Sequence, residues 1–409
     1  MSPQTTSGPV ARCLYGGGER SRCGERAICN SRFSIPDRVH TVLDAIATGN
    51  PPTRCCQEEA ARFMQQVEGS PEALRKRLPA IYEKTGIDYR YSAVEDYARA
   101  PEDFTFYPRH WDGDPPTTAE RNQKYREVAP GLAERVASEA LAESGHAPAE
   151  VTHLIAVSCT GFFAPGLDVE LVKRLGLPRD TQRTLIGFMG CYAAFNAMRA
   201  AHHVCQHQEN ARVLVVCVEL CTLHFQISQT IRSAAVNALF SDGAAAAVFS
   251  ARKDDEARGR LAYADGHTLL DDDSGGEMTW DIGDTGFLMG LTARVPKVIA
   301  GHLPGYLDAL LPAEISRGEV DFWAIHPGGR AIVEQAQETL GLTDGQVADS
   351  FEVLRRRGNM SSPTVLFILK RFLERHQKAR AAGQEGFRRG VAMAFGPGLT
   401  LEGARFERA

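Results

Sequence analysis

The feature that most restricts the fold of this chain is an alternation of apolar strands with amphipathic helices, which occurs twice along the sequence. The first run predicts strands and helices at 153–158, 167–176, 183–187, 192–207, 212–218 and 244–249. The second run predicts them at 261–264, 295–311, 322–325, 328–340, 361–374, 391–395 and 399–406. Such alternation is typical of a largely parallel sheet that is covered by helices.

Two successive runs predict an internal duplication, and a chain of 409 residues suits two fused modules. We expect an irregular N-terminal extension at 1–40, a first module at 41–255 and a second module at 256–409. A long helix is predicted at 119–145, because Gly145 and then Pro148 end the periodic pattern. The sequence assigns no role to the extension.

Composition and charge exclude several classes of function. The formal net charge is −5 and no basic stripe stands out, so we expect no nucleic-acid partner. The N-terminus lacks the apolar stretch of a signal peptide, and no apolar run approaches the ~20 residues that span a bilayer. We therefore expect a cytoplasmic protein without a membrane span.

The ten cysteines contain no CxxC pair, so the sequence predicts neither a structural zinc site nor any other metal site. In a reducing compartment they do not form a disulfide framework. We expect most of them to be small buried hydrophobic residues and one or two to be chemically special. His202, His203 and His207 share one predicted helix, but they lack nearby carboxylates and favour a surface position over a metal site.

The strongest local signal surrounds Cys191, in the segment Gly-Phe-Met-Gly-Cys-Tyr-Ala-Ala at 187–194. A strand ends there, two glycines permit a tight turn, and a helix of small residues begins. A cysteine at a helix N-terminus is favoured as the nucleophilic thiolate by the unpaired N–H groups and the helix dipole. The alternative is a buried cysteine at a packed turn.

A thiolate nucleophile needs a partner, and His326 is the candidate. The segment 321–329 is a strand that runs into Pro-Gly-Gly, which places the histidine at the carboxyl end of a strand, where ligands bind in α/β sheets. There an imidazolium can stabilise the thiolate and later donate a hydrogen bond to a developing oxyanion.

Asn359 is the third candidate, in Arg-Gly-Asn-Met-Ser-Ser-Pro at 357–363. Its amide can donate a hydrogen bond to a thioester or enolate oxygen. The alternative is that Asn359 only caps the helix that follows, since Ser361, Ser362 and Pro363 are typical of a helix N-terminus.

Taken together, the segments around Cys191, His326 and Asn359 resemble the Cys–His–Asn signatures of the type III polyketide synthases, the chalcone synthase-like enzymes. Further segments match in the same order, namely ATGNPP at 47–52, LFSDGAAA at 239–246 and FGPGLT at 395–400. The resemblance runs from about residue 40 to the C-terminus.

The resemblance implies an α/β, thiolase-like fold with a duplicated αβαβα five-layer core. It also implies a homodimer that needs no metal or redox cofactor and uses acyl-CoA and malonyl-CoA as substrates. Cys191 would carry the acyl group, while His326 and Asn359 would bind the malonyl thioester during loss of CO2.

The resemblance further assigns residues to the substrate. Phe240 matches one phenylalanine of the family's gate between CoA tunnel and cavity, although a plain core aromatic is the alternative. Met289 replaces the second gate phenylalanine, and Phe287 partly compensates. The remaining substrate-binding positions are Cys159, Thr160, Ala164, Cys221, His224, Trp280 and Ser361. Lys84 and Arg77 match contacts to CoA phosphates, whereas Ala80 stands where plant members place an arginine.

Departures from the plant pattern bear on the starter unit. Ala164 replaces a methionine that reaches across the dimer, which would open a route for a long acyl chain. The segments 158–161 and 279–287 resemble bacterial alkylpyrone and alkylresorcinol synthases. We therefore expect a medium- or long-chain fatty acyl starter and two or three malonyl extensions. Whether Cys159 is an accessory thiol or cavity wall stays open, with the wall favoured.

Several alternatives remain. A ketoacyl synthase III shares Cys, His and Asn, but the Met-Ser-Ser after Asn359 and the FGPGLT segment favour the polyketide enzyme. A tetrahydroxynaphthalene-type synthase would use malonyl-CoA alone. A non-catalytic binding protein would have no need for all three residues, and a cysteine hydrolase would not explain the duplicated architecture.

Overall fold

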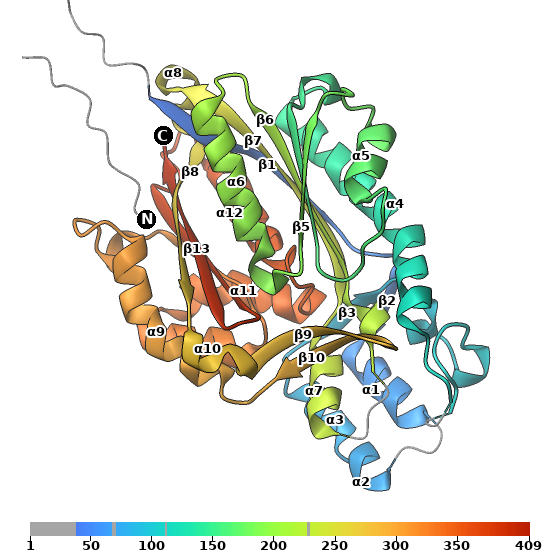
Figure 1. The fold of residues 1–409 in the computed structure, drawn as a ribbon. Coiled ribbons are helices and arrows are strands. Elements are labelled where there is room, and N and C mark those ends of the chain that lie inside the picture. Colours follow the sequence, from blue (N-terminus) through green and yellow to red (C-terminus); the bar gives the residue numbers. More distant parts are fainter. Residues whose placement is uncertain (1–37, 68–70, 111–112, 227–229) are drawn as a thin grey trace, which may run out of the picture. The chain divides into compact units, whose positions relative to one another are not determined.

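The computed structural model describes residues 38–67, 71–110, 113–226 and 230–409. Within this part, nine strands form one sheet in the order β11-β12-β13-β8-β1-β7-β6-β4-β5 (Figure 1). These strands are β1 (Val39–Gly49), β4 (His153–Ser158), β5 (Gln182–Gly187), β6 (Arg212–Leu220), β7 (Asp242–Lys253), β8 (Leu261–Leu270), β11 (Phe322–Ile325), β12 (Arg389–Gly396) and β13 (Thr400–Arg408). The predicted extension at 1–40 lies almost entirely outside the described residues.

Two small antiparallel pairs lie apart from this sheet. They are β2 (Thr53–Cys56) with β3 (Tyr89–Ser92), and β9 (Met278–Gly283) with β10 (Gly286–Leu291). The helices are α1 (Gln57–Gln66), α2 (Glu72–Arg75), α3 (Leu78–Glu83), α4 (Thr118–Ser144), α5 (Leu167–Leu175), α6 (Ala193–His207), α7 (Ile231–Leu239), α8 (Asp254–Ala257), α9 (Val295–Leu310), α10 (Arg330–Leu340), α11 (Asp344–Arg357) and α12 (Thr364–Ala381). No helix of the described part is both long and apolar enough to cross a membrane.

The sheet repeats one strand order in its two halves. Outward from the centre, the first half runs β1, β7, β6, β4 and β5, and the second runs β8, β13, β12 and β11. In each half, the strand that comes first in the sequence therefore lies beside the strand that comes last. The last strand lies in turn beside the strand that precedes it in the sequence. The halves meet where β1 pairs with β8. This repeated order is the internal duplication that the sequence predicts, while the exact module boundary at 255 stays a prediction.

The expectation of a largely parallel sheet is wrong, because the sheet is mixed. Parallel pairing joins β4 to β5, β4 to β6, and β11 to β12. The last strand of each half, β7 or β13, runs antiparallel to both of its neighbours. The alternating pattern reveals strands and helices but not the direction in which a closing strand is inserted.

Three apolar cores divide the fold into layers. One core joins α4 and α5 to an outer face of the first half-sheet, and another joins α9 and α10 to an outer face of the second. Between them, α6 and α12 pack against residues from both half-sheets (Figure 1). The order is thus helix, sheet, helix, sheet, helix, as the resemblance implies. In α6 the buried residues include four alanines, which allow close packing in this central layer.

Candidate active site

Cys191 stands between the end of β5 and the start of α6, in a short 3-10 turn at Gly190–Tyr192. Gly190 has a φ of 79°, and a Cβ atom there would lie 2.4 Å from Cδ of Pro397. Only glycine tolerates both the positive φ and the lack of room for a Cβ atom, so this residue lets the turn pack against the 395–400 segment. The Cys191 side chain is buried, with 6% of its surface exposed.

Asn359 is held by its backbone beside Phe240. Its N–H donates to the Leu239 carbonyl at 3.0 Å, and its carbonyl accepts from Ser241 N at 2.8 Å. Its side-chain oxygen accepts from Ser361 N at 2.8 Å, and its side-chain nitrogen donates to the Gly328 carbonyl at 3.1 Å. Helix α12 begins after Pro363 without a side-chain cap, so Asn359 does not cap it.

His326 follows β11 directly and is fully buried. Its backbone N–H donates to the Met393 carbonyl at 2.8 Å, which fixes the turn. Among the described residues neither ring nitrogen has a hydrogen-bond partner. Buried polar atoms are normally paired, so two unpaired ring nitrogens are unusual for a structural histidine. Because Asn359 binds the Gly328 carbonyl, the loop of Asn359 and the turn after His326 are joined.

The three segments converge, and burial acts on the protonation states of their reacting groups. Burial raises the pKa of the Cys191 thiol to about 11, although hydrogen bonds from Ser361 and Asn359 oppose the shift. Burial likewise lowers the pKa of His326 to about 3. Both shifts favour the neutral forms, a thiol and an uncharged imidazole, at neutral pH. Desolvation therefore opposes the resting thiolate that the helix terminus favours, and the thiolate stays a prediction.

Two cavities meet at Cys191. The inner cavity, of about 180 Å³, lies on the side of β6, β9 and β10, and the entrance cavity, of about 340 Å³, lies beside α3 and the start of α10. Three residues, Cys191, Phe240 and Met289, line both. The two positions that the sequence assigns to a gate therefore stand where the cavities join.

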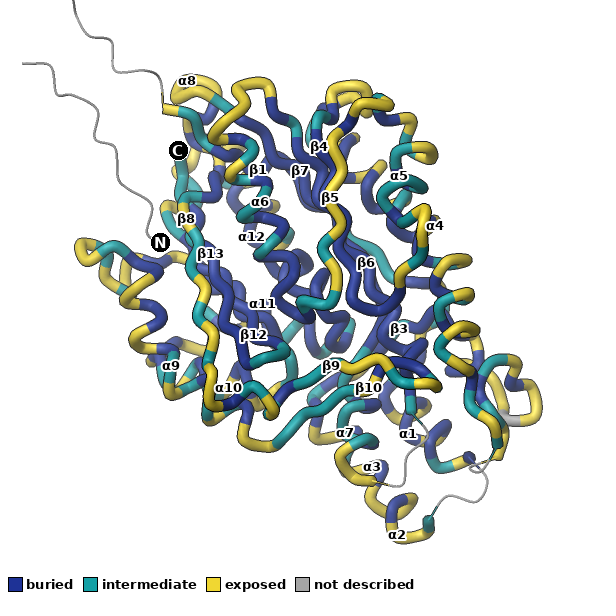
Figure 2. The backbone as a smooth tube through the Cα atoms, in the orientation of Figure 1, coloured by how far each residue is buried: buried dark blue, intermediate teal, exposed yellow. Residues whose placement is uncertain are grey.

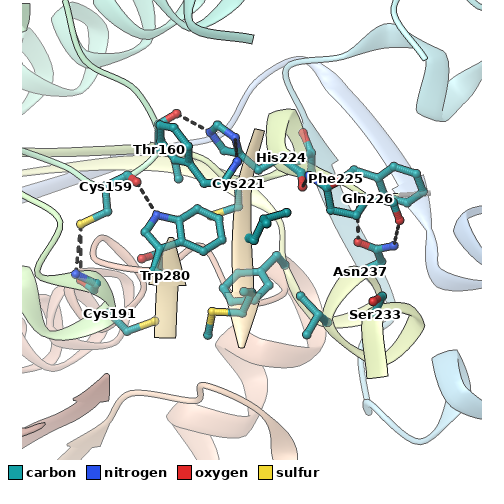
Figure 3. Close-up of a pocket in the computed structure, with 18 of the residues that line it drawn as sticks. Cys159, Thr160, Cys191, Cys221, His224, Phe225, Gln226, Ser233, Asn237 and Trp280 are labelled. Carbon is teal, nitrogen blue, oxygen red and sulfur yellow. Dashed lines mark hydrogen bonds between the residues drawn. The ribbon is translucent and has the colours of Figure 1, made fainter. Parts of the chain in front are cut away.

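Most of the predicted site residues line these cavities. The inner cavity is lined by Cys159, Thr160, Cys221, His224, Phe240, Trp280, Phe287, Met289 and Ser361 (Figure 3). Asn359 and Lys84 line the entrance cavity, whereas the fully buried His326 lines neither cavity and lies behind the entrance-lining Gly328. Ala164 and Arg77 are exposed and line neither cavity, so a role for them in this chain's own cavities finds no support.

His224 uses both of its ring nitrogens within the protein. Nδ1 accepts from Phe287 N at 3.0 Å, so Nε2 carries the proton and donates it to the Thr160 carbonyl at 2.7 Å. Burial lowers the pKa of His224 to about 3, which keeps the ring neutral. The ring stacks on Phe287 with a centroid separation of 4.0 Å. His224 is therefore cavity wall and has no polar atom left for a ligand.

Trp280 and Cys159 extend this wall toward Cys191. Trp280 Nε1 donates to the Cys159 carbonyl at 2.7 Å (Figure 3). Cys159 Sγ accepts from the N–H of Gly190 at 3.1 Å, directly before Cys191. Burial raises the pKa of the Cys159 thiol well above its usual value. These contacts favour cavity wall over an accessory thiol.

The sequence reasoning missed Glu219, at the end of β6. Its carboxylate is fully buried and accepts from Cys159 N at 2.9 Å, Thr160 Oγ1 at 2.8 Å and Ser362 Oγ at 2.7 Å. Burial raises its pKa to about 7, against the effect of these hydrogen bonds. Glu219 links the loop after β4 to the Asn359 loop. A lone acidic residue in the apolar run 212–220 was the available signal.

The cysteines of the described part agree with the expectation that most of them are small buried residues. The seven cysteines of the described part are free, and six of them are buried. In the same part, no group of His, Cys, Asp or Glu side chains is arranged to hold a metal ion.

Comparison with known proteins identifies the family. Residues 29–253 match the N-terminal domain of chalcone and stilbene synthases, and residues 264–407 match the C-terminal domain. The chain is 33% identical over 375 residues to "Alpha-pyrone synthesis polyketide synthase-like Pks18" of Mycobacterium tuberculosis, covering 91% of this chain and 92% of the relative. It is 34% identical over 411 residues to bisdemethoxycurcumin synthase of Oryza sativa subsp. japonica, covering 98% and 97%.

Solved structures agree. PKS-I of the brown alga Ectocarpus siliculosus superimposes with a TM-score of 0.86 at 38% identity, covering 91% of this chain and 99% of that one. The C-terminal type III polyketide synthase domain of Steely1 from Dictyostelium gives 0.80 at 25% identity, with coverages of 90% and 99%. The chain therefore has the thiolase-like fold and belongs to the chalcone and stilbene synthase family, the type III polyketide synthases, which are acyltransferases that form carbon–carbon bonds.

Proposed function

We propose that this type III polyketide synthase loads a medium- or long-chain fatty acyl group from CoA onto Cys191. It then extends the chain with malonyl-CoA and closes it to an alkylpyrone or alkylresorcinol. The observation that carries the proposal is the meeting of two cavities at Cys191, Phe240 and Met289. The entrance cavity suits the pantetheine arm, and the inner cavity suits the growing chain.

The loading step begins from a neutral pair. Cys191 Sγ attacks the carbonyl carbon of the starter thioester while its proton passes to an unpartnered ring nitrogen of His326. The tetrahedral intermediate collapses, the carbon–sulfur bond to CoA breaks, and the imidazolium returns the proton to the departing CoA thiolate. Proton transfer within the step replaces the resting ion pair that the sequence suggested.

The extension step uses His326 and Asn359 as donors. The Asn359 amide has two N–H groups, of which one donates to the Gly328 carbonyl, and the side chain also hydrogen-bonds to the Cys191 thiol. In the extension step this second N–H turns from the sulfur to the thioester oxygen. Malonyl-CoA loses CO2, and the enolate oxygen accepts hydrogen bonds from both residues. The carbanion then attacks the acyl-Cys191 carbonyl, the carbon–sulfur bond to Cys191 breaks, and the departing thiolate takes up one proton from water. Each such donor is worth about 3–4 kcal/mol in the transition state.

The starter class rests on the inner cavity and on one relative. The cavity wall is mainly apolar, and its polar wall atoms at His224 and Trp280 are occupied within the protein. An alkyl chain suits such a surface better than a polar starter. The relative from Mycobacterium tuberculosis is named for alpha-pyrone synthesis. The small volume of the inner cavity, about 180 Å³, favours the second candidate, a synthase that uses malonyl-CoA alone.

We also propose a homodimer in the cytoplasm. Strand β5 forms the edge of the sheet, and most of its residues are exposed (Figure 2). Leu185 on this strand and Phe162 on the nearby loop are each 48% exposed. Exposed apolar edge strands pair readily with another copy. The exposed Ala164 lies two residues from Phe162, which suits a residue that reaches the partner's cavity.

The test is an incubation of the protein with malonyl-CoA and saturated acyl-CoA starters from acetyl to eicosanoyl, with products read by mass spectrometry. Cys191→Ala is the control, and the intact mass of the protein reports acylation. Alkylpyrones or alkylresorcinols formed only with Cys191 would support the proposal. A product from malonyl-CoA alone would favour the second candidate, and an unacylated Cys191 with no product would refute both.

A further inference from the structure

The wall of the entrance cavity contains two cations and no acidic side chain. Lys84 and Arg330 are the cations, and most of the other lining residues are apolar, glycine or threonine. Arg330 is the first residue of α10 and follows His326 by four positions. Both cations are exposed, whereas Cys191 and Asn359, which line the same cavity, are buried. The positive charge therefore stands at the solvent side and the reacting groups at the closed side.

Arg330 and the Lys84 turn are in contact. Gly86 has a φ of 70°, and a Cβ atom built there would lie 3.2 Å from Cδ of Arg330. The aliphatic part of the arginine thus crosses the turn two residues after Lys84. Lys84, which follows α3, and Arg330, which begins α10, therefore line the same cavity although they are far apart in the sequence.

Helix α3 alone does not supply the charge that a CoA ester requires. The resemblance assigns three positions to phosphates, one within α3 and one at each end of it, and of these only Lys84 lines the cavity. Ala80 has no charge, and Arg77 is exposed outside the lining. A pyrophosphate at the mouth of the cavity would meet a single lysine from α3. Arginine offers paired N–H groups that match phosphate oxygens, so Arg330 can fill this need.

We propose that Arg330, together with Lys84, binds the pyrophosphate of CoA at the mouth of the entrance cavity, in place of the cation absent at Ala80. The proposal rests on the proposed use of CoA thioesters. Glu334 now binds Arg330 Nε at 2.7 Å, one turn along α10. An exposed pair of this kind stabilises a helix little, so stability alone does not explain the arginine. Glu334 instead competes with the phosphate for the guanidinium.

The primary test is calorimetric titration with CoA and with pantetheine, which lacks the pyrophosphate and nucleotide. Arg330→Ala should weaken CoA binding about tenfold and leave pantetheine binding unchanged. Arg330→Lys should restore part of the affinity, and Glu334→Gln should strengthen CoA binding. The control is Arg317→Ala, which removes an exposed arginine that lines neither cavity. Thermal melting checks that each variant is folded.

Kinetics separate this proposal from the proposed function. The KM for malonyl-CoA should rise in Arg330→Ala while kcat and the KM for malonyl-N-acetylcysteamine stay constant. Equal losses with both thioesters would show that Arg330 only positions the His326 turn, and unchanged CoA binding would also overturn the proposal. If the wild-type protein condenses neither thioester, the proposed function fails, and the titration with CoA still decides the role of Arg330.

Discussion

At the scale of single residues, the reacting groups of the candidate active site are buried, and burial favours their neutral forms. Cys191 and His326 are both buried, and burial moves their pKa values in opposite directions, upward for the thiol and downward for the imidazole. From these neutral forms, nucleophilicity has to be generated during the reaction.

The first prediction concerns the reactivity of Cys191 toward iodoacetamide. Because its pKa is raised to about 11, the thiolate fraction should grow about tenfold per pH unit from pH 7 to 10 without reaching a plateau. Alkylation would be followed by peptide mass spectrometry, with Cys191→Ala to assign the site. Saturation of the rate by pH 8 would show instead that the resting residue is a thiolate.

The second prediction concerns Glu219. Replacement by Gln leaves one acceptor oxygen for donors on Cys159, Thr160 and Ser362, and it places an NH2 group against one of them. We expect a loss of about 1–3 kcal/mol in unfolding free energy, measured by urea denaturation at pH 8. Glu209→Gln, at an exposed ion pair with Lys253, is the control and should have no effect.

The pH dependence of this variant tests the carboxylate directly. The folded pKa of Glu219 is raised to about 7, so its contribution to stability is present below the unfolded pKa and is lost as pH rises through 7. The wild-type protein should therefore lose stability relative to Glu219→Gln between about pH 4.5 and 7. A difference that does not change with pH would contradict the raised pKa.

At the scale of elements, the hairpin of β9 and β10 closes the inner cavity, and the sequence did not predict it. Its burial pattern does not alternate cleanly, since both strands mix exposed and half-buried positions. Helix α11 was missed because its 14 residues carry many charges and bury only a narrow stripe. Most strands of the sheet and the helices α6 and α12 were predicted because their apolar runs are continuous, whereas the central strand β1 was not predicted.

Some residues of the candidate site could likewise be predicted from the sequence, and others could not. Cys191, His326 and Asn359 follow from local turns, because each lies where a strand or loop meets a helix. The residues that line the cavity were predicted from the resemblance, whereas the contacts that these residues make are seen only in the structure. Glu219 and Arg330 could not be assigned from sequence, since the partners of each lie on other segments far away in the chain.

The third prediction tests the hairpin as a determinant of chain length. Trp280→Ala removes the indole that contacts His224 and Phe287, and so it enlarges the inner cavity. We expect the preferred starter to become longer by several carbons, as measured by competition among acyl-CoA starters. Trp280→Phe, which keeps most of the bulk but loses the bond to the Cys159 carbonyl, should change the preference much less. Equal shifts in both variants would point to that hydrogen bond instead.

At the scale of the whole molecule, the duplication explains why the site lies between the modules. His326 follows β11 and Cys159 follows β4, which occupy equivalent places in the two halves of the sheet. Cys191 precedes α6 and Asn359 precedes α12, the two helices of the central layer. Each half therefore brings one strand end and one helix start to the same region. Neither half alone contains the full constellation.

The last prediction concerns the assembly of two copies of the whole molecule. If β5 pairs with β5 of a second copy, Leu185→Lys should place a charge in the interface and convert the dimer to a monomer at micromolar concentration. Leu270→Lys is the matched control, because Leu270 is 58% exposed at the end of β8. Sedimentation velocity would measure the state. A monomeric wild-type protein, or a dimer that resists Leu185→Lys, would contradict pairing through this edge.

In the dimer, Ala164→Met should shorten the preferred starter, and in the Leu185→Lys monomer it should have no effect, because the residue lines neither cavity of its own chain.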